Sequence, residues 1–233
     1  MIAACHIDAP VWHLDIRGEV AEMSSNASAY NGEPLPAVRQ HRTEGNTVGS
    51  LSGRQRSIII GSLLGDGAMR CKDNALLEIN HAFEQKFYVD WKYQQLANLV
   101  TTPPKARKGN GARIAYRFTT RSLPELTPFY RWFYSGEHKV VPGDLVLDPL
   151  SWAVWFMDDG CKSHRALYLN TQKFDLDSQC RLIKFLGDQW GVKATLNRDK
   201  QYLRIRIAVE SVPRFKAIVA PHILPRFQYK FPI

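Results

Sequence analysis

The sequence predicts a mixed fold of the α/β (α+β) class in which two similar halves follow an N-terminal segment. Three observations predict it. From Leu51 onward the expected order of elements is helix, strands and helix, and this order then recurs. Each half opens with an apolar helix that ends in aspartate and glycine, in "GDG" (65–67) and "DDG" (158–160). A lysine that stands just ahead of a proline follows each aspartate at nearly the same distance.

The spacing of these landmarks indicates an internal duplication. Lys139 follows Asp66 by 73 residues, and Lys230 follows Asp159 by 71 residues. Two similar halves are expected at this length, because a solenoid needs three or more repeats. We therefore divide the chain into an N-terminal extension (1–50), a first half (51–148) and a second half (149–233).

In the first half, Ser52 is suited to cap a helix that runs through "RQRSIIIGSLLGD" (54–66). Aromatic residues four positions apart predict an amphipathic helix in "AFEQKFYVDWKYQQLANLV" (82–100). Two strands are expected around "GNG" (109–111), because glycine and asparagine favour the tight turn of a hairpin. A short aromatic helix (123–134) and a linker punctuated by glycine and proline (135–149) complete this half.

In the second half, "LSWAVWFMDDG" (150–160) predicts the helix that matches the first one. A strand should begin in "RALYLNTQKF" (165–174), and an amphipathic helix should follow in 177–191. A strand pair is expected in 192–209, with "NRDK" at the turn. Ser211 is expected to cap the closing helix.

The charge is uneven along the 233-residue chain, whose formal net charge is +9. Residues 1–53 carry −3 and the remainder about +12, so the globular part is strongly basic. Such a surface indicates a nucleic-acid partner first and an anionic membrane surface second. No apolar run reaches the length of a membrane span, so we expect no membrane partner.

Cysteine and histidine usage excludes two common kinds of site. The four cysteines have no C-x-x-C spacing, so neither structural zinc nor a disulfide scaffold is expected. We infer an intracellular protein of a bacterial cytoplasm or an organelle. Four histidines have no ligand spacing and are expected to be structural or on the surface: His81, His138, His164 and His222.

The two helix-terminal aspartates predict a metal site. A carboxylate at a helix C-terminus is disfavoured by roughly 0.3–1 kcal/mol. Gly61 and Gly65 lie on one helix face and permit close packing with the second helix, which would bring Asp66 and Asp159 together. A divalent cation would relieve their repulsion, and Mg²⁺ prefers carboxylate and phosphate oxygens. Metal beside a basic surface indicates phosphodiester hydrolysis.

Basic side chains alternate along the strands expected in both halves. Such a strand pair has an apolar back and an arginine front, which suits the major groove of DNA. The front residues are Arg113, Arg117 and Arg121 in the first half, and Tyr202, Arg204 and Arg206 in the second. Phosphate contacts are expected from Lys105, Arg107, Lys108, Lys193 and Arg198.

Taken together, these residues resemble the LAGLIDADG homing endonucleases in their single-chain, two-motif form. The resemblance rests on "IIGSLLGDG" (59–67), "AVWFMDDG" (153–160), "LNTQKF" (169–174) and "YKFP" (229–232), and it covers roughly 54–233. It implies two pseudo-symmetric αββαββα halves, with the motif helices packed at the centre and antiparallel sheets forming a DNA-binding saddle. Val154 replaces the small glycine of the motif, so we expect the helices to pack less closely at that level.

The resemblance also implies a function. It implies a monomer that cuts double-stranded DNA at a long specific site with Mg²⁺, for which Mn²⁺ substitutes. Asp66 and Asp159 would be metal-binding acids, Gly65 and Asp158 would offer carbonyl oxygens, and Lys139 and Lys230 would be the active-site lysines. Gln172 would lie near the metals. Two alternatives are an intron maturase with an RNA partner, and a DNA-binding regulator that does not cleave.

Overall fold

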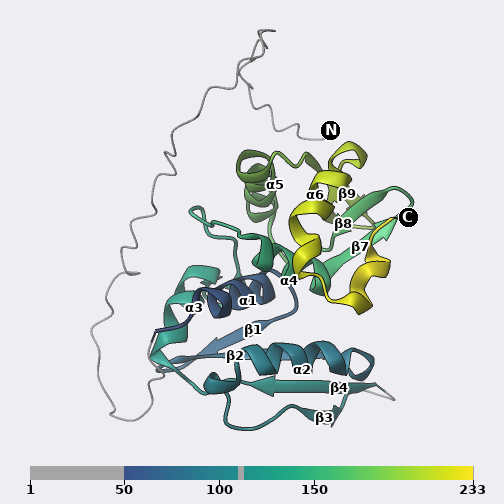
Figure 1. The fold of residues 1–233 in the computed structure, drawn as a ribbon. Coiled ribbons are helices and arrows are strands. Elements are labelled where there is room, and N and C mark those ends of the chain that lie inside the picture. Colours follow the sequence, from purple (N-terminus) through teal and green to yellow (C-terminus); the bar gives the residue numbers. More distant parts are fainter. Residues whose placement is uncertain (1–49, 110–112, 233) are drawn as a thin grey trace, which may run out of the picture. The chain divides into compact units, whose positions relative to one another are not determined.

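The structure is a computed structural model that describes residues 50–109 and 113–232 (Figure 1). The predicted N-terminal extension, apart from Ser50, lies outside the described residues, as do positions 110–112 of the expected "GNG" hairpin. The division of the remainder into two halves between residues 148 and 149 stays our interpretation.

The elements of the first half follow the predicted order of helix, strands and helix, with a further strand pair at its end. They are α1 (Gly53–Leu64), β1 (Ala68–Cys71), β2 (Ala75–Ala82), η1 (Phe83–Gln85), α2 (Lys86–Gln95), η2 (Ala97–Leu99), β3 (Lys105–Lys108), β4 (Ile114–Thr119), η3 (Pro124–Leu126), α3 (Thr127–Phe133), β5 (Tyr134–Ser135) and β6 (His138–Lys139).

The second half repeats this order without the short final strand pair. Its elements are α4 (Pro149–Asp159), β7 (Gly160–Ser163), β8 (Ala166–Leu169), α5 (Leu176–Trp190), β9 (Ala194–Asp199), β10 (Tyr202–Ile207), η4 (Val209–Ser211), α6 (Val212–Val219), η5 (Ala220–His222) and η6 (Pro225–Lys230).

Each half contains a four-stranded antiparallel sheet of the same topology. The strand order is β1-β2-β4-β3 in one sheet and β7-β8-β10-β9 in the other. The predicted mixed fold with antiparallel sheets is therefore confirmed. Apolar and basic side chains alternate along β4 and β10 as predicted. The apolar residues that face the core are Tyr116, Phe118, Ile205 and Ile207. The segment expected to be a linker begins with the two-stranded hairpin β5–β6, which holds Lys139 in place.

Helices α1 and α4 pack side by side at the centre of the fold (Figure 1). Ser57 near the start of α1 donates to Asp148, which caps α4, and Gly65 after the end of α1 contacts Asp158. The two helices therefore run in parallel, with their C-termini together. The N-cap of α1 is Ser52, as predicted, in a capping box with Gln55.

Two local expectations were wrong. Val154 does not separate the motif helices, because it fills space left by Gly61: a Cβ on Gly61 would lie 2.7 Å from the Val154 Cβ. Ser211 stands at the N-cap position of α6, but its hydroxyl makes no capping hydrogen bond and instead accepts one from the backbone N–H of Lys193 at 3.0 Å.

Candidate active site

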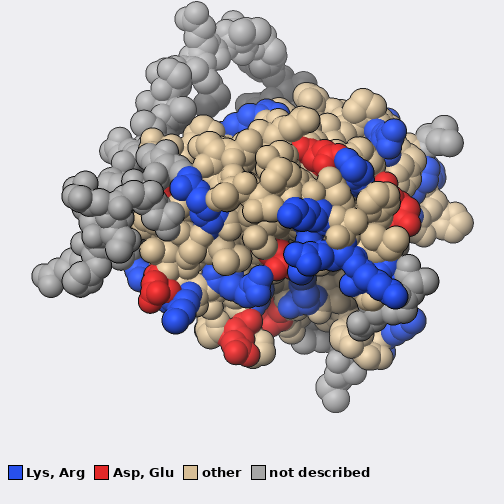
Figure 2. Space-filling view, turned by 90° about the horizontal axis from the view of Figure 1, so that it is seen from below, with Lys and Arg blue, Asp and Glu red and all other residues tan. Residues whose placement is uncertain are grey.

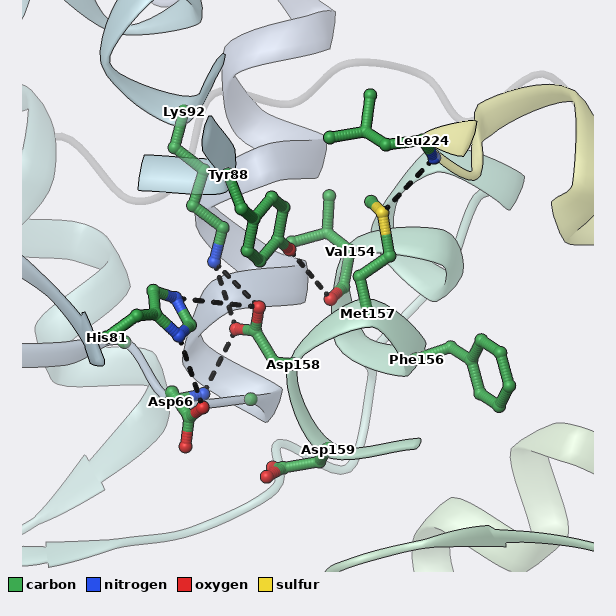
Figure 3. Close-up of polar contacts among 12 residues, drawn as sticks. Asp66, His81, Tyr88, Lys92, Val154, Phe156, Met157, Asp158, Asp159 and Leu224 are labelled. Atoms are coloured by element: carbon green, nitrogen blue, oxygen red, sulfur yellow. Dashed lines mark hydrogen bonds and ion pairs between the residues drawn. The ribbon is translucent and has the colours of Figure 1, made fainter. Parts of the chain in front are cut away.

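The C-terminal ends of α1 and α4 bring two aspartates to one place, as the sequence predicted (Figure 3). Asp66 follows Gly65, the C-cap of α1, and Asp159 is the last residue of α4. The side chain of Asp66 is 45% exposed and that of Asp159 is 13% exposed. The two carboxylates are close enough for the charge of Asp66 to raise the pKa of Asp159.

Asp158 is a buried structural acid. Its side chain is fully buried and forms an ion pair with Lys92 of α2, at 2.8 and 3.0 Å from Nζ to the two carboxylate oxygens. It also accepts a hydrogen bond from the backbone N–H of Asp66 at 3.1 Å. Burial alone would raise the pKa of Asp158, but the charge and hydrogen bonds of the Lys92 ammonium outweigh it and hold the pKa below its usual value. The carboxylate of Asp158 is thus committed to Lys92 and the Asp66 backbone.

His81 lies between two of the acids. Its Nδ1 is 3.5 Å from Asp66 Oδ2, and its Nε2 is 3.9 Å from Asp158 Oδ1 (Figure 3). Burial and the Lys92 charge lower the pKa of His81, so the imidazole is neutral at neutral pH and these contacts are not ion pairs. The prediction of a structural role agrees with this burial.

Lys139 and Lys230 bind the carbonyl oxygens at the two helix ends. Lys139 Nζ donates to Gly67 O at 2.6 Å and to Gly65 O at 3.4 Å. Lys230 Nζ donates to Met157 O at 2.5 Å and contacts Asp158 O at 3.4 Å. An ammonium at each C-terminus offsets the negative end of the helix dipole, which helps these helices tolerate terminal acids.

A third lysine, Lys173, was not predicted for this site. Its Nζ is 3.0 Å from Asp159 Oδ2 and 2.5 Å from Gly65 O, so it joins the end of α4 to the end of α1. Lys173 sits in a turn after β8 that is closed by a hydrogen bond from Phe174 N to Thr171 O. Gln172, its neighbour, donates instead to Asp199 of β9 at 3.1 Å.

Three further ionisable groups of the site have shifted pKa values. Burial raises the pKa of the Asp159 carboxyl to about 6, while Lys173 lowers it and Asp66 raises it further. Burial and the charge of Lys173 lower the pKa of Lys139 to about 7. Burial also lowers the pKa of Lys230, against the attraction of Asp158 and Asp159. Such shifts in neighbouring groups mark candidate functional sites.

The chemistry of these groups fits a cation. Lys173 places a positive charge between the Asp159 carboxylate and the Gly65 carbonyl, which shows that the position accepts one. Within residues 50–109 and 113–232, no three His, Cys, Asp or Glu side chains gather into a group that could hold a metal ion. A metal here would therefore need backbone carbonyls, water or substrate oxygens as well as the two acids.

Of the basic residues predicted on the first sheet, Lys105 and Arg107 share the face of Arg117, whereas Lys108 stands opposite Ile114 and lies on the other face. Lys105, Arg107 and Lys108 are exposed on β3, and Arg117 of β4 is half-exposed. Glu78 of β2 lies 2.7 Å from Arg70 and 3.6 Å from Arg117. Arg113 is exposed just before β4, whereas Arg121 lies beyond the end of β4 and donates to Asn98 O at 3.0 Å.

The second sheet carries its predicted residues in a similar way. Tyr202 is exposed at the start of β10, and Arg206 pairs with Tyr168 and Thr195 across the sheet. Arg204 lies over the Tyr168 ring, with 4.3 Å between Cζ and the ring centroid. Lys193 precedes β9, and Arg198 is exposed on it. Figure 2 shows one face of the molecule on which Lys and Arg side chains cover more surface than Asp and Glu.

A weak sequence signal did exist for Lys92, one of the residues that sequence reasoning missed. Lys92 follows Tyr88 by four residues and precedes Leu96 by four, so it interrupts an otherwise apolar helix stripe. A lysine in such a stripe indicates a buried partner. Lys173 carries no comparable signal, because it stands in a turn where a lysine is usually solvated.

Comparisons with known proteins agree on one family. The model of the family described as "LAGLIDADG DNA endonuclease family" matches residues 56–215. The chain is 32% identical over 208 residues to the cytochrome b mRNA maturase bI2 of Saccharomyces cerevisiae, covering 79% of this chain and 49% of that protein. It is 27% identical to the probable intron-encoded endonuclease 1 of Wickerhamomyces canadensis, covering 78% of this chain and 85% of that protein.

A solved structure is also similar. It is described as the homing endonuclease I-WcaI bound to its DNA recognition sequence, and it matches with a TM-score of 0.73 and 26% identity. The match covers 79% of this chain and 89% of that chain. The chain spans about half the length of several curated relatives that it matches, the yeast maturase among them. In the part of the chain that the structure describes, no helix is long and apolar enough to cross a membrane.

Proposed function

Because the chain belongs to the LAGLIDADG DNA endonuclease family, we propose that it is a site-specific homing endonuclease that hydrolyses both strands of double-stranded DNA. The observation that carries the proposal is the meeting of Asp66 and Asp159 at the ends of two parallel helices (Figure 3). The cleavage would initiate mobility of an intron or of the gene itself. One chain supplies both halves, so we propose that it acts as a monomer.

In this proposal Asp66 and Asp159 hold Mg²⁺, for which Mn²⁺ substitutes, and Gly65 and Asp158 contribute carbonyl oxygens. When bound, the metal would supply Lewis-acid activation of water and of the leaving oxygen. The Asp158 carboxylate is assigned a positioning role, because Lys92 and the Asp66 backbone N–H already occupy it. Lys139 and Lys230 would present positive charge toward a scissile phosphate from their places at the helix ends.

The solvent side of each sheet would contact the DNA. Its arginines would read bases, and the lysines at its edge would bind phosphates. Arg204 is held over Tyr168 and Arg117 lies near Glu78, so both guanidinium groups are partly preorganised. The similarity to a homing endonuclease solved on its DNA recognition sequence supports this partner.

The test is a cleavage assay on a library of double-stranded DNA sites, with Mg²⁺ and then with EDTA. We expect metal-dependent cleavage at one long site. Asp66→Asn and Asp159→Asn should each reduce cleavage by about a hundredfold or more, since each removes a ligand charge. Asp188→Asn is the matched control, because Asp188 is exposed on α5 and pairs only with Lys184 in the described contacts. Specific binding without cleavage would instead identify a regulator.

A maturase is the second candidate, supported by the 32% identity to the yeast cytochrome b mRNA maturase bI2. RNA folding does not require the paired acids or the lysines of the site. The discriminating assay is splicing of an intron RNA, with the Asp66→Asn variant as the comparison. Splicing assistance that survives this substitution, without metal-dependent DNA cleavage by the unaltered chain, would favour the maturase.

A further inference from the structure

Lys173 occupies the position between the two motif ends. Its ammonium contacts one oxygen from each half: the carboxylate of Asp159 at 3.0 Å and the carbonyl of Gly65 at 2.5 Å. Both oxygens belong to the groups that we assign to the metal. An ammonium has three donors and no acceptor, so it satisfies these oxygens in the way a bound cation would.

The other two lysines of the site behave differently. Lys139 and Lys230 donate to backbone carbonyls, and no ion pair of either with a carboxylate is found among the described residues. Both are mostly buried, whereas the Lys173 side chain is 34% exposed and extends from a surface turn. The flexible stem of Lys173 therefore leaves its ammonium free to move toward solvent without unfolding any element.

From this arrangement we propose that Lys173 is a placeholder cation. Its ammonium occupies the metal position while DNA is absent. Lys173 and a divalent cation therefore compete for the Asp159 carboxylate. When DNA binds, a backbone phosphate offers the Lys173 ammonium an alternative anionic partner. The inference rests on the proposed metal site, and it adds that the free protein binds divalent cations weakly because its own lysine competes.

The test measures Mn²⁺ binding by the DNA-free protein, with free Mn²⁺ followed by electron paramagnetic resonance. Lys173→Met should bind Mn²⁺ about ten- to a hundredfold more tightly than the unaltered chain, as expected when a charge-assisted contact no longer competes. Lys139→Met is the matched control, because it removes an ammonium that donates to the carbonyls of Gly65 and Gly67 but touches no carboxylate, and its gain should be clearly smaller. Lys173→Gln, which keeps a polar side chain, should behave like Lys173→Met.

The outcomes separate this inference from the proposed function. Equal Mn²⁺ affinity in Lys173→Met and the unaltered chain, or no binding by either, would overturn the placeholder. An equal gain in Lys139→Met would also overturn it, because the effect would then be one of general charge. If Asp159→Asn leaves Mn²⁺ binding unchanged in the Lys173→Met background, Asp159 is not a metal ligand. The metal site of the proposed function would then be wrong. Thermal unfolding of each variant verifies that it is folded.

Discussion

The two motif helices end in similar sequences but in different surroundings. Asp66 at the end of α1 is 45% exposed and faces a neutral histidine, His81. Asp159 at the end of α4 is 13% exposed and is held by a lysine, Lys173. One acid is therefore open and the other is already engaged with a cation. The two motif ends therefore share their acids and differ in the groups that surround those acids.

The residues that support the two motif aspartates also differ between the two helix ends. Gly65 and Asp158 are equivalent, since each directly precedes its motif aspartate. Lys92 of α2 is fully buried, whereas the buried apolar side chains of α5, the matching helix of the other half, are Leu182 and Leu186. Among the described residues, the buried ion pair Asp158–Lys92 has no counterpart on the other side: Gly65 stands in the place of Asp158, and no charged side chain of α5 is buried. This ion pair takes one partner from each half, so both halves contribute to the charged support beneath the motif ends.

The largest expected effect comes from breaking that ion pair. Asp158→Ala or Lys92→Leu alone should lower the free energy of unfolding by about 3–5 kcal/mol, because either change leaves one buried charge unpaired. The double variant Asp158→Ala/Lys92→Leu, which imitates the apolar side, should lose less than either single variant. Urea unfolding measures all three. A double variant that loses the sum of the single effects would show that the ion pair does not act as a unit.

A smaller effect is expected from the engaged acid. The pKa of Asp159 is raised in the folded chain, so the folded state holds its proton more tightly than the unfolded state does. Stability therefore falls as pH rises through the interval from about 4 to about 6. Asp159→Asn should be more stable than the unaltered chain by about 1–3 kcal/mol at pH 7 and by almost nothing at pH 4. Thermal melts at both pH values check this, and a gain of equal size at pH 4 would contradict it.

The last comparison concerns two glycines, and its control has the smallest expected effect. Gly61→Ala should cost about 1–3 kcal/mol, because the new methyl group would press on Val154 and the Ser151 carbonyl. Gly187→Ala in α5 is the matched control: nothing lies within 4 Å of its new Cβ, so the change should add about 0.5–1 kcal/mol. Chemical denaturation compares the two variants. A stabilising Gly61→Ala would mean that the helices can separate at no cost.

Much of this arrangement could be predicted from sequence because it depends on short-range patterns. The apolar runs before Asp66 and Asp159, and the nearly equal spacing to Lys139 and Lys230, indicate the duplication, whose mixed fold with antiparallel sheets is confirmed. The pairing of Lys92 with Asp158 depends instead on the tertiary packing that brings α2 to the end of α4. Spacing along the chain does not specify this packing. The contact of Lys173 with Gly65 likewise joins residues 108 positions apart. The hairpin β5–β6 has strands of only two residues, too short for a periodic signal.

The contact between Gly61 and Val154 has a consequence for how this chain can evolve. The two residues are equivalent, each five positions before its motif aspartate, and each is the other's neighbour across the helix pair. A symmetric dimer of the first half would set glycine against glycine and leave a void, and a dimer of the second half would set valine against valine. The same dimer of the second half would bury two Asp158 carboxylates face to face. Either half would therefore need substitutions at this contact before it could pair with a copy of itself.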